Sequence, residues 1–437
     1  MNPKKRAFPP KYNILFVHAA IGQFKELHIH LNVSKKANAY TLCSHGIKER
    51  EKDKITNLRV FAAVEQKIEN QFFYIQKIDE HTRRAFGVRQ AVLELMKDVK
   101  LDLIVAHGSG GPPLMLFDEE EIDVPIITYI EFPSFTAHGH DPKYKQPEFS
   151  RYRDKLFDMS SMHQVIRSDH IITPSAYAKR MYPHYLQHKI TPQMEGFKLK
   201  SPTKELPIEK DPDKTYIGYT ARDLSSAKGF EQFILIAREI LKERTNVKFV
   251  IIGSPKVLYS YEGTVLEEVY GKGHEKTFKD YIFEREKIDT EFKEYFEYYD
   301  FMEYDKYHAY LHAIDFFIYP LQYGSANWGF YEIFCRGKIV LGSDRCFIPE
   351  VLEHEINGFI CPYDDLQNWA KIAIKVIDHP EDYEYMRKNI EVTSQKYMIE
   401  NIADEYLEIF HKVILNRRHQ KEEHHTFRCE CKEEFEN

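Results

Sequence analysis

Two groups of polar residues follow apolar runs in the second half of the chain, where they could bind a phosphorylated ligand. In the stretch GYTARDLSSAKGF (218–230), Arg222 and Lys228 flank a turn of small residues, and Gly229 opens a predicted helix. A helix start presents N–H groups and a partial positive charge, which suits a phosphate. Two cations beside it would neutralise a diphosphate. The spacing is equally compatible with two surface cations in an ordinary strand-to-helix loop.

The second group is the stretch GSANWGFYEIFCRGK (324–338), in which one carboxylate, Glu332, stands among aromatic residues. A carboxylate one turn into the predicted helix could accept both hydroxyls of a ribose. The turn amides from Ala326 through Asn327 to Trp328 would then approach a phosphate or a sugar. The alternative is a glutamate placed where the helix dipole favours it. The loop by itself does not separate these two interpretations.

Polar residues and glycines also follow three predicted strands in the first half of the chain. Gly22 in HAAIGQF permits a close backbone approach after the first strand, as phosphate-facing turns require. His107 and Gly108 follow another strand, and Glu131 ends a third. Because the carboxyl ends of parallel strands open onto one edge of a sheet, these residues are candidates for a shared site. Each one alone is weak evidence, since polar residues at strand ends are common.

The elements that must position these residues alternate between strand and helix. YNILFVH (12–18), LDLIVAH (101–107) and VPIITYIEF (124–132) are buried-strand candidates, and helical segments separate them. The alternation predicts a parallel sheet covered by helices on both faces.

The same pattern restarts after a polar segment that contains three prolines. We therefore predict a first domain over 1–197, a linker over 198–213 and a second domain over 214–396. A final helix over 397–416 is expected to pack back on the first domain, and the charged tail 417–437 is expected to be mobile. The predicted fold class is α/β, with two doubly wound domains facing a cleft at the carboxyl ends of their strands.

Composition limits the class of protein and its location. Hydrophobic residues at 43% and aromatic residues at 14% can build substantial cores. Apolar runs such as DFFIYPL (315–321) are far shorter than the roughly 18 residues that span a bilayer. Six scattered cysteines and a start without an apolar signal region favour a cytoplasmic protein.

The charge is divided unevenly along the chain. Residues 1–200 hold 30 Lys and Arg against 23 Asp and Glu, whereas the rest holds 31 against 45. An acidic chain argues against nonspecific nucleic-acid binding. The basic first half could face an anionic lipid surface, so a peripheral membrane contact is an open expectation.

Taken together, these residues resemble the retaining, two-domain (GT-B) glycosyltransferases of family 4, whose two domains are Rossmann-like. The stretches ILFVHAAIGQF, YIEFPSFTAHGHDPKY and ARDLSSAKGF are similar to a bacterial subgroup of that family. The resemblance implies that Arg222 and Lys228 hold the diphosphate of a nucleotide-sugar donor, and that Glu332, the second glutamate of an E-x7-E motif, binds its ribose.

The chain departs from the family pattern at two positions. The first glutamate of E-x7-E, which usually contacts the transferred sugar, would fall at position 324, where this chain has Gly324. A histidine that the family often carries after an acceptor-domain strand is replaced by Glu131. Both changes fall around the sugar, and they leave the identity of the sugar open.

The resemblance implies transfer with retention of anomeric configuration, to a glycan or lipid-linked acceptor, without a protein nucleophile, cofactor or metal. Arg222, Lys228 and Glu131 are the predicted catalytic residues. His424, His425, Cys429 and Cys431 in the tail offer soft metal ligands, although their spacing matches no zinc finger.

Two alternatives to a glycosyltransferase stay open. One is a nucleotide-sugar epimerase that uses Glu131 and His107 as acid and base, and the other is a non-catalytic nucleotide-sugar-binding protein.

Overall fold

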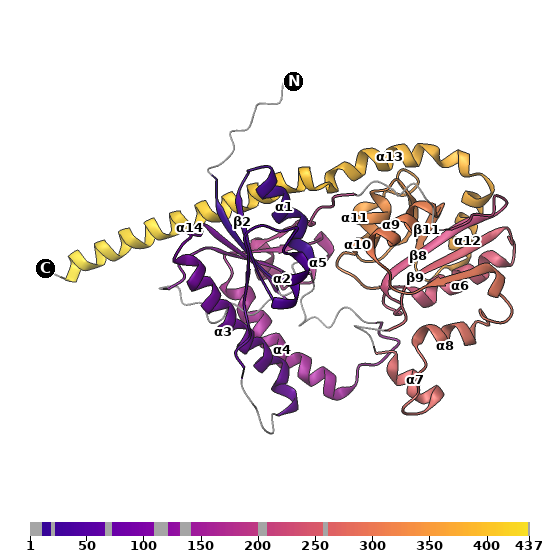
Figure 1. Cartoon of the computed structure of the whole chain (residues 1–437), viewed down its shortest axis with the longest axis horizontal. Helices are drawn as coiled ribbons and strands as arrows, with labels where there is room; N and C mark the ends of the chain where they lie inside the picture. Colours follow the sequence, from indigo (N-terminus) through magenta and orange to yellow (C-terminus); the bar gives the residue numbers. More distant parts are fainter. Residues whose placement is uncertain are drawn as a thin grey trace, which may run out of the picture.

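Two parallel β-sheets, each covered by helices, form the protein (Figure 1). The computed structural model describes residues 11–18, 22–65, 72–108, 121–131, 141–199, 208–256 and 261–435 of the chain. Within these residues the two α/β units confirm the predicted fold class. The tail residues His424, His425, Cys429 and Cys431 belong to a segment whose side chains lie outside this description.

The first sheet has seven strands in the order β3-β2-β1-β4-β5-β6-β7. Every neighbouring pair in it is parallel. The strands are β1 (Asn13–Val17), β2 (Asn38–Cys43), β3 (Leu58–Val60), β4 (Leu103–His107), β5 (Ile126–Tyr129), β6 (His170–Thr173) and β7 (Ile190–Pro192). Its helices are α1 (Lys25–Val33), α2 (His45–Glu51), α3 (Gln76–Met96), α4 (Glu148–Arg167) and α5 (Ala176–Arg180).

The second sheet has six parallel strands in the order β10-β9-β8-β11-β12-β13. The strands are β8 (Thr215–Asp223), β9 (Val247–Ser254), β10 (Phe296–Tyr299), β11 (Phe316–Tyr319), β12 (Ile339–Ser343) and β13 (Phe359–Cys361). The helices are α6 (Phe230–Leu241), α7 (Gly263–Tyr270), α8 (Phe278–Arg285), α9 (Tyr304–Ala313), α10 (Trp328–Phe334), α11 (Ile348–Val351), α12 (Leu366–Asp378) and α13 (Glu384–Ser394).

The strand order reverses once in each sheet, between β1 and β4 in the first and between β8 and β11 in the second. In doubly wound sheets, ligands bind outside the carboxyl ends of the strands at such a reversal. One predicted ligand-binding stretch of the second domain spans the end of β8, and the other follows β11. The topology therefore places both of them at the reversal point.

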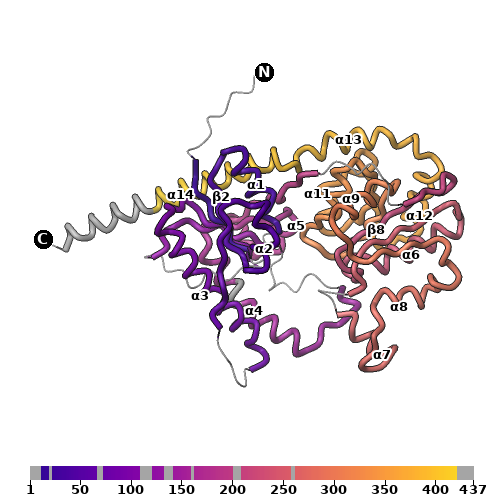
Figure 2. Tube along the Cα trace, viewed as in Figure 1, coloured from indigo at the N-terminus to yellow at the C-terminus, as the bar shows by residue number. Residues whose placement is uncertain are grey.

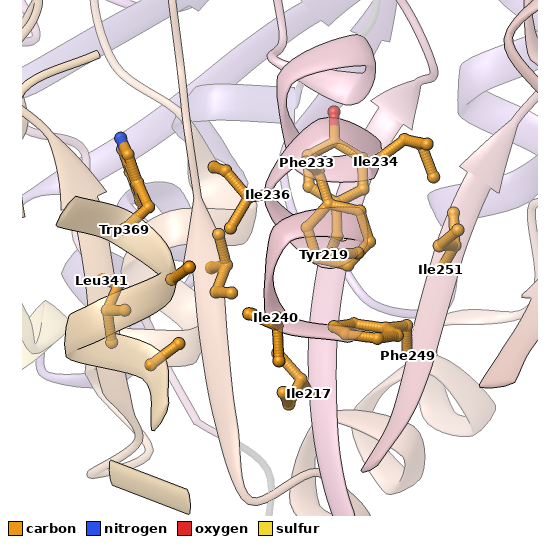
Figure 3. Packing of buried hydrophobic residues seen from close by; sticks show 14 of the residues in the cluster. Ile217, Tyr219, Phe233, Ile234, Ile236, Ile240, Phe249, Ile251, Leu341 and Trp369 are labelled. Carbon is orange, nitrogen blue, oxygen red and sulfur yellow. The ribbon is translucent and has the colours of Figure 1, made fainter. Parts of the chain in front are cut away.

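The core of the second domain explains why its strands are continuous apolar runs. One face of the sheet packs against α6 and α12, where Phe233, Ile240 and Trp369 are fully buried against Tyr219 and Ile251 (Figure 3). The opposite face packs against α9, α10 and α11. Strands that are buried on both faces cannot alternate apolar with polar residues, so the sheet is held by hydrophobic contacts on two sides.

The chain returns from the second domain to the first near its C-terminal end (Figure 2). Helix α14 (Ile399–Phe435) packs Ile402, Tyr406 and Phe410 against the first sheet, in one cluster with Phe16 of β1. The helix is longer than the predicted 397–416 and continues into the charged segment. Residues such as Arg, Lys and Glu are strong helix formers, which favours this continuation.

No helix in the described ranges has both the length and the hydropathy needed to cross a membrane.

Candidate functional site

Two loops meet at the reversal point of the second sheet. We name them the β8–α6 turn (residues 224–229) and the β11–α10 loop (residues 320–327). The carbonyl of Ala227 accepts the N–H groups of Gln322 at 3.2 Å and Tyr323 at 3.0 Å, which joins the loops. Gly229 has φ +85°, and a Cβ at this position would lie 1.8 Å from the carbonyl oxygen of Pro320. A glycine is therefore required where the two loops approach.

The amides of the β8–α6 turn are less available than predicted. The N–H groups of Lys228 and Gly229 donate to the carbonyls of Ser225 and Ser226 within the turn. The N–H of Ser226 donates to Oε1 of the fully buried Glu262 at 2.7 Å. The expectation of unpaired helix-start amides is wrong for these three groups, because a tight turn and a buried carboxylate satisfy them. The cationic side chains are left as the main anion-binding groups of the turn.

The predicted catalytic residues of the two domains lie close together. Arg222 is exposed at the end of β8, and Lys228 is half-buried in the turn. Glu131, which follows β5 in the first domain, is close enough for both cations to stabilise its charged form. Burial nevertheless raises the pKa of Glu131, because its carboxylate loses contact with water. The junction between the domains thus collects two cations and one carboxyl group.

Lys228 has a second acidic neighbour in Asp223. Burial lowers the pKa of Lys228, and the charges of Asp223 and Glu131 oppose that shift. Asp223 is fully buried, and neither of its carboxylate oxygens has a hydrogen-bond partner among the described residues. Lys228 therefore serves partly to compensate a buried carboxylate, while exposed Arg222 faces solvent.

Glu332 is a buried residue rather than a surface residue at a helix start. It is the fifth residue of α10, is only 4% exposed and lies outside the first turn. The hydroxyl of Tyr304 donates to its Oε1, and Nε2 of His308 lies 4.0 Å from the same oxygen. Burial raises the pKa of Glu332 to about 7, although the hydrogen bond from Tyr304 and the charge of Arg336 lower it. The helix-dipole interpretation does not explain this position, because the dipole acts mainly within the first turn.

A chain of polar contacts connects Glu332 to the end of β8. Tyr307 lies near Glu332, and its hydroxyl accepts a hydrogen bond from Oγ1 of Thr220 at 3.2 Å. Thr220 precedes Arg222 by two residues. The two groups of polar residues singled out in the sequence therefore belong to one region of the second domain.

The other residues of the β11–α10 loop have mixed roles. Oδ1 of Asn327 accepts the N–H of Gly329 at 3.0 Å, so this side chain caps α10. Trp328 is partly exposed, and its ring lies 5.9 Å from that of Phe197. Ala326 is half-buried next to them.

Gly324 is buried, and its backbone does not demand glycine. Its φ is not in the left-handed region, and a Cβ would approach only Leu321, at 3.1 Å from Cδ2. A neighbouring loop supplies Cys346, whose thiol donates to the carbonyl of Gln322 at 3.1 Å. The backbone conformation at 324 therefore does not exclude a residue with a carboxylate side chain.

The strand ends of the first domain contain a buried histidine pair. The rings of His18 and His107 lie 4.2 Å apart and pack against Phe24. Burial lowers the pKa of His18 to about 4 and holds that of His107 well below its usual range. Both rings are therefore neutral near pH 7, so His107 is poorly suited to the acid and base work of an epimerase.

The two glycines predicted to approach a ligand differ in their surroundings. A Cβ at Gly108, just after β4, would lie 2.4 Å from Cγ1 of Ile130, just after β5. The close packing of these two strand ends therefore requires glycine at this position. A Cβ at Gly22 would have no neighbour within 4 Å. Gly22 begins the short 3₁₀ helix η1 (Gly22–Phe24), which also carries Gln23, whose amide donates to Oε1 of Glu131.

Sequence reasoning missed a second buried carboxyl group at the junction, Glu195. The hydroxyl of Tyr129 donates to its Oε1, and the side chain of Trp328 lies beside it. Burial, aided by the nearby charge of Glu131, raises the pKa of Glu195 to about 8. No local pattern marks this residue, because its burial depends on contacts from both domains.

Sequence reasoning assigned no role to the segment 141–146, which reaches from the first domain to both loops of the second. Asp141 accepts hydrogen bonds from Oγ of Ser226 and from Nε2 of Gln322, the latter at 3.3 Å. Two further residues, Lys143 and Tyr144, bind the carboxylate of Glu231 on α6 at 2.6 and 3.0 Å. The ring of Tyr144 is buried in the core of the second domain. The first domain thus helps to hold the loops that carry the predicted site.

Among the described side chains, no group of three or more His, Cys, Asp or Glu residues is placed to hold a metal ion.

Comparisons with known proteins agree with this architecture. Residues 38–201 match the family described as glycosyl transferase family 4 group, and residues 202–393 match glycosyl transferases group 1. A search of the curated proteins found no match.

Solved structures with the same fold cover nearly the whole chain. Anabaena HepE in complex with UDP and glucose is 15% identical, with a TM-score of 0.59 and coverage of 92% of this chain and 100% of that one. Sucrose-phosphate synthase from Thermosynechococcus elongatus is 12% identical, with a TM-score of 0.66 and coverage of 93% and 100%. TarM is 10% identical, with a TM-score of 0.60 and coverage of 92% and 99%.

The fold and the two family matches together support a glycosyltransferase of the GT-B fold class. Its two halves match two different families of glycosyl transferase domains.

Proposed function

We propose that the protein transfers a sugar from a nucleotide-diphosphate sugar to a glycan or lipid-linked acceptor, with retention of anomeric configuration. The observation that carries the proposal is the approach of Arg222 and Lys228 to Glu131 across the domain junction. Residues 1–197 would hold the acceptor and residues 214–396 the donor, with 198–213 as the linker. HepE, which shares the fold, has been captured with UDP and glucose, which supports a nucleotide sugar as donor.

The proposed reaction needs positioning and charge stabilisation rather than a protein nucleophile. The bond between the anomeric carbon and the diphosphate oxygen breaks, and the acceptor oxygen bonds to that carbon on the same face. The acceptor proton passes to the departing diphosphate oxygen. Arg222 and Lys228 would stabilise the charge that develops there. Glu131, half-buried on the first-domain side, would orient the acceptor hydroxyl or the sugar.

The remaining assignments place the nucleotide beside Glu332 and the sugar near the first domain. Glu332 would accept the ribose hydroxyls, and the backbone from Ala326 to Trp328 would approach the phosphates. Gly22 would bind the donor from the first domain, and His107 and Gly108 would contact the acceptor or the sugar. We propose a cytoplasmic enzyme that needs neither metal nor cofactor, and whose basic first half contacts a membrane peripherally.

A panel of nucleotide sugars tests the proposal directly. We expect one donor to raise the melting temperature and to release its nucleoside diphosphate, with faster release when an acceptor glycan is present. A donor that binds without turnover would identify a non-catalytic sugar-nucleotide-binding protein, which Gly324 makes the main alternative. A new epimer in the donor-only reaction, observed by NMR, would identify an epimerase instead. The absence of binding by every donor would contradict all three.

Changing Glu332 to glutamine should mainly weaken donor binding and should remove its pH dependence. With a pKa of about 7, the ionised fraction of Glu332 falls about tenfold between pH 8 and pH 6. If the carboxylate accepts the ribose hydroxyls, the donor dissociation constant of the unmodified protein should rise by about the same factor. Calorimetric titrations at both pH values, on both proteins, measure the effect.

Stability gives the control for this experiment. Because burial raises the pKa of Glu332, the free energy of unfolding should decrease as the pH rises from about 4 to about 7. The glutamine variant should lack that decrease. If the glutamine variant lacks this decrease in stability but binds the donor normally at both pH values, Glu332 does not belong to the donor site.

A further inference from the structure

An exposed aromatic surface lies on the first domain, where α4 begins. It is formed by the short helix η2 (Phe73–Ile75) and the first two turns of α4. Helix α4 and the neighbouring α3 lie along the lower edge of the first domain in Figure 1. We name this surface the η2–α4 face, and its members are Phe72, Phe73, Ile75, Lys145, Phe149, Arg151, Tyr152 and Lys155.

The apolar members of the face are strongly exposed and adjacent. The five large apolar side chains are each between 41 and 62% exposed. The rings of Phe73 and Phe149 lie 6.0 Å apart, which connects η2 to α4. Phe149 and Tyr152 are three residues apart and therefore share one side of the helix. Single exposed apolar residues are ordinary, but a contiguous group of this kind marks an interaction site.

Cationic side chains surround the aromatic ones. The guanidinium of Arg151 lies 5.3 Å from the ring centre of Tyr152, and that of Arg153 lies 5.9 Å from the ring centre of Phe73. Lys145 and Lys155 are exposed on either side of them along the chain.

Acidic residues do not cancel this charge. Glu148 is exposed but lies 3.9 Å from Arg151, so it offsets only one of the cations. Asp154, which is half-buried, pairs with Arg153 at 3.5 Å and with Lys77 of α3 at 3.2 Å. The cations that it leaves unbalanced are therefore Lys145, Arg151 and Lys155. The exposed members of the face therefore combine aromatic rings with a net positive charge.

This combination suits the interface of a lipid bilayer. Aromatic rings enter the boundary between headgroups and acyl chains, while Lys and Arg side chains remain among anionic headgroups. The charge distribution of the whole chain agrees, because residues 1–200 are net basic and the remainder is net acidic. An anionic surface would attract the first domain and repel the second.

We propose that the η2–α4 face docks the protein on the surface of an anionic phospholipid bilayer. One consequence of docking, that the first domain would be brought to a lipid-linked acceptor, rests on the proposed function. The docking itself requires no donor, no acceptor and no turnover.

Sedimentation of the full chain with vesicles tests the proposal. We expect binding to vesicles that mix phosphatidylcholine with phosphatidylglycerol in equal parts, and little binding to phosphatidylcholine alone. Replacing Arg151 and Lys155 by glutamine should weaken binding about fivefold per charge, and added salt should weaken binding of the unmodified chain.

A matched pair of variants on α4 separates the face from general hydrophobicity. Phe149→Glu should lower vesicle binding at least about tenfold, because it removes an aromatic ring and adds repulsion. Ile166→Glu, at the far end of the same helix where Ile166 is 63% exposed, should bind as the unmodified chain does. Melting temperatures of both variants confirm that each is folded.

Three results would overturn the proposal: an unmodified chain that stays in the supernatant, equal binding to both vesicle types, or equal losses in the two variants. Self-association that Phe149→Glu abolishes, without vesicle binding, would assign the face to a dimer and would also overturn it. Arg222→Ala should sediment normally with vesicles. Vesicle binding by a chain that transfers no sugar would therefore contradict the proposed function and leave the docking surface intact.

Discussion

Replacing Arg222 by alanine is expected to lower kcat about 100-fold while leaving the melting temperature nearly unchanged. Charge on the departing diphosphate is greatest in the transition state, so loss of a cation beside it should affect kcat more than KM. Arg222 is exposed, and substitutions at exposed positions usually change stability by less than about 0.5 kcal/mol. Initial rates with the donor identified by the panel, together with thermal melts, measure both quantities.

Arg222 gives a cleaner test than Lys228. Removing the ammonium of Lys228 would take a cation from beside the buried carboxylate of Asp223, so a loss of activity could arise from a distorted turn. Arg244→Ala is the control, because this half-buried arginine lies just beyond the far end of α6 and pairs with Asp378 at 2.7 Å. Equal activity of the Arg222 and Arg244 variants would place Arg222 outside the site.

The parts of the site that could be predicted from sequence are those set by local pattern. Arg222 lies at the end of β8, Lys228 follows that strand and Glu332 follows β11. Apolar runs of this kind mark buried parallel strands without any knowledge of their partners. The reversal of strand order then fixes where the following loops lie. Once two doubly wound domains were predicted, the gathering of these residues followed from topology.

The parts that could not be predicted depend on contacts between distant segments. Asp141 reaches Ser226 across 85 positions of the chain, and Glu195 is buried by residues of both domains. Glu262 lies in a long polar segment for which no role was predicted, yet it satisfies a turn amide that was expected to bind phosphate. Periodicity reports which face of an element is buried, but it does not report which residue of another element covers it.

The same limit applies to Gly324. The sequence indicated a missing carboxylate, and the structure shows that φ does not force glycine there, although a Cβ would require a small shift of the Leu321 side chain, 3.1 Å away. Its neighbours include the thiol of Cys346, which no motif had marked. Under the proposed function, the surroundings of this position would help to decide which sugar fits.

Replacing Gly229 by alanine is expected to have the largest effect on the second domain. Its φ of +85° costs a residue with a Cβ about 1–2 kcal/mol. The new Cβ would also lie 1.8 Å from the carbonyl oxygen of Pro320, so either the β8–α6 turn or the β11–α10 loop must move. Movement would break the hydrogen bonds from Gln322 and Tyr323 to Ala227. Both predicted halves of the donor site would then be displaced together.

Gly273→Ala separates the backbone strain from the contact. Gly273 has nearly the same φ, +83°, but a Cβ there would have no neighbour within 4 Å. We expect this control to lose only about 1–2 kcal/mol of stability and to keep its donor affinity. Gly229→Ala should lose at least about 2 kcal/mol more and should bind the donor at least about tenfold more weakly. Denaturant unfolding and donor titration measure the two quantities, and equal losses in both variants would show that the joined loops do not shape the site.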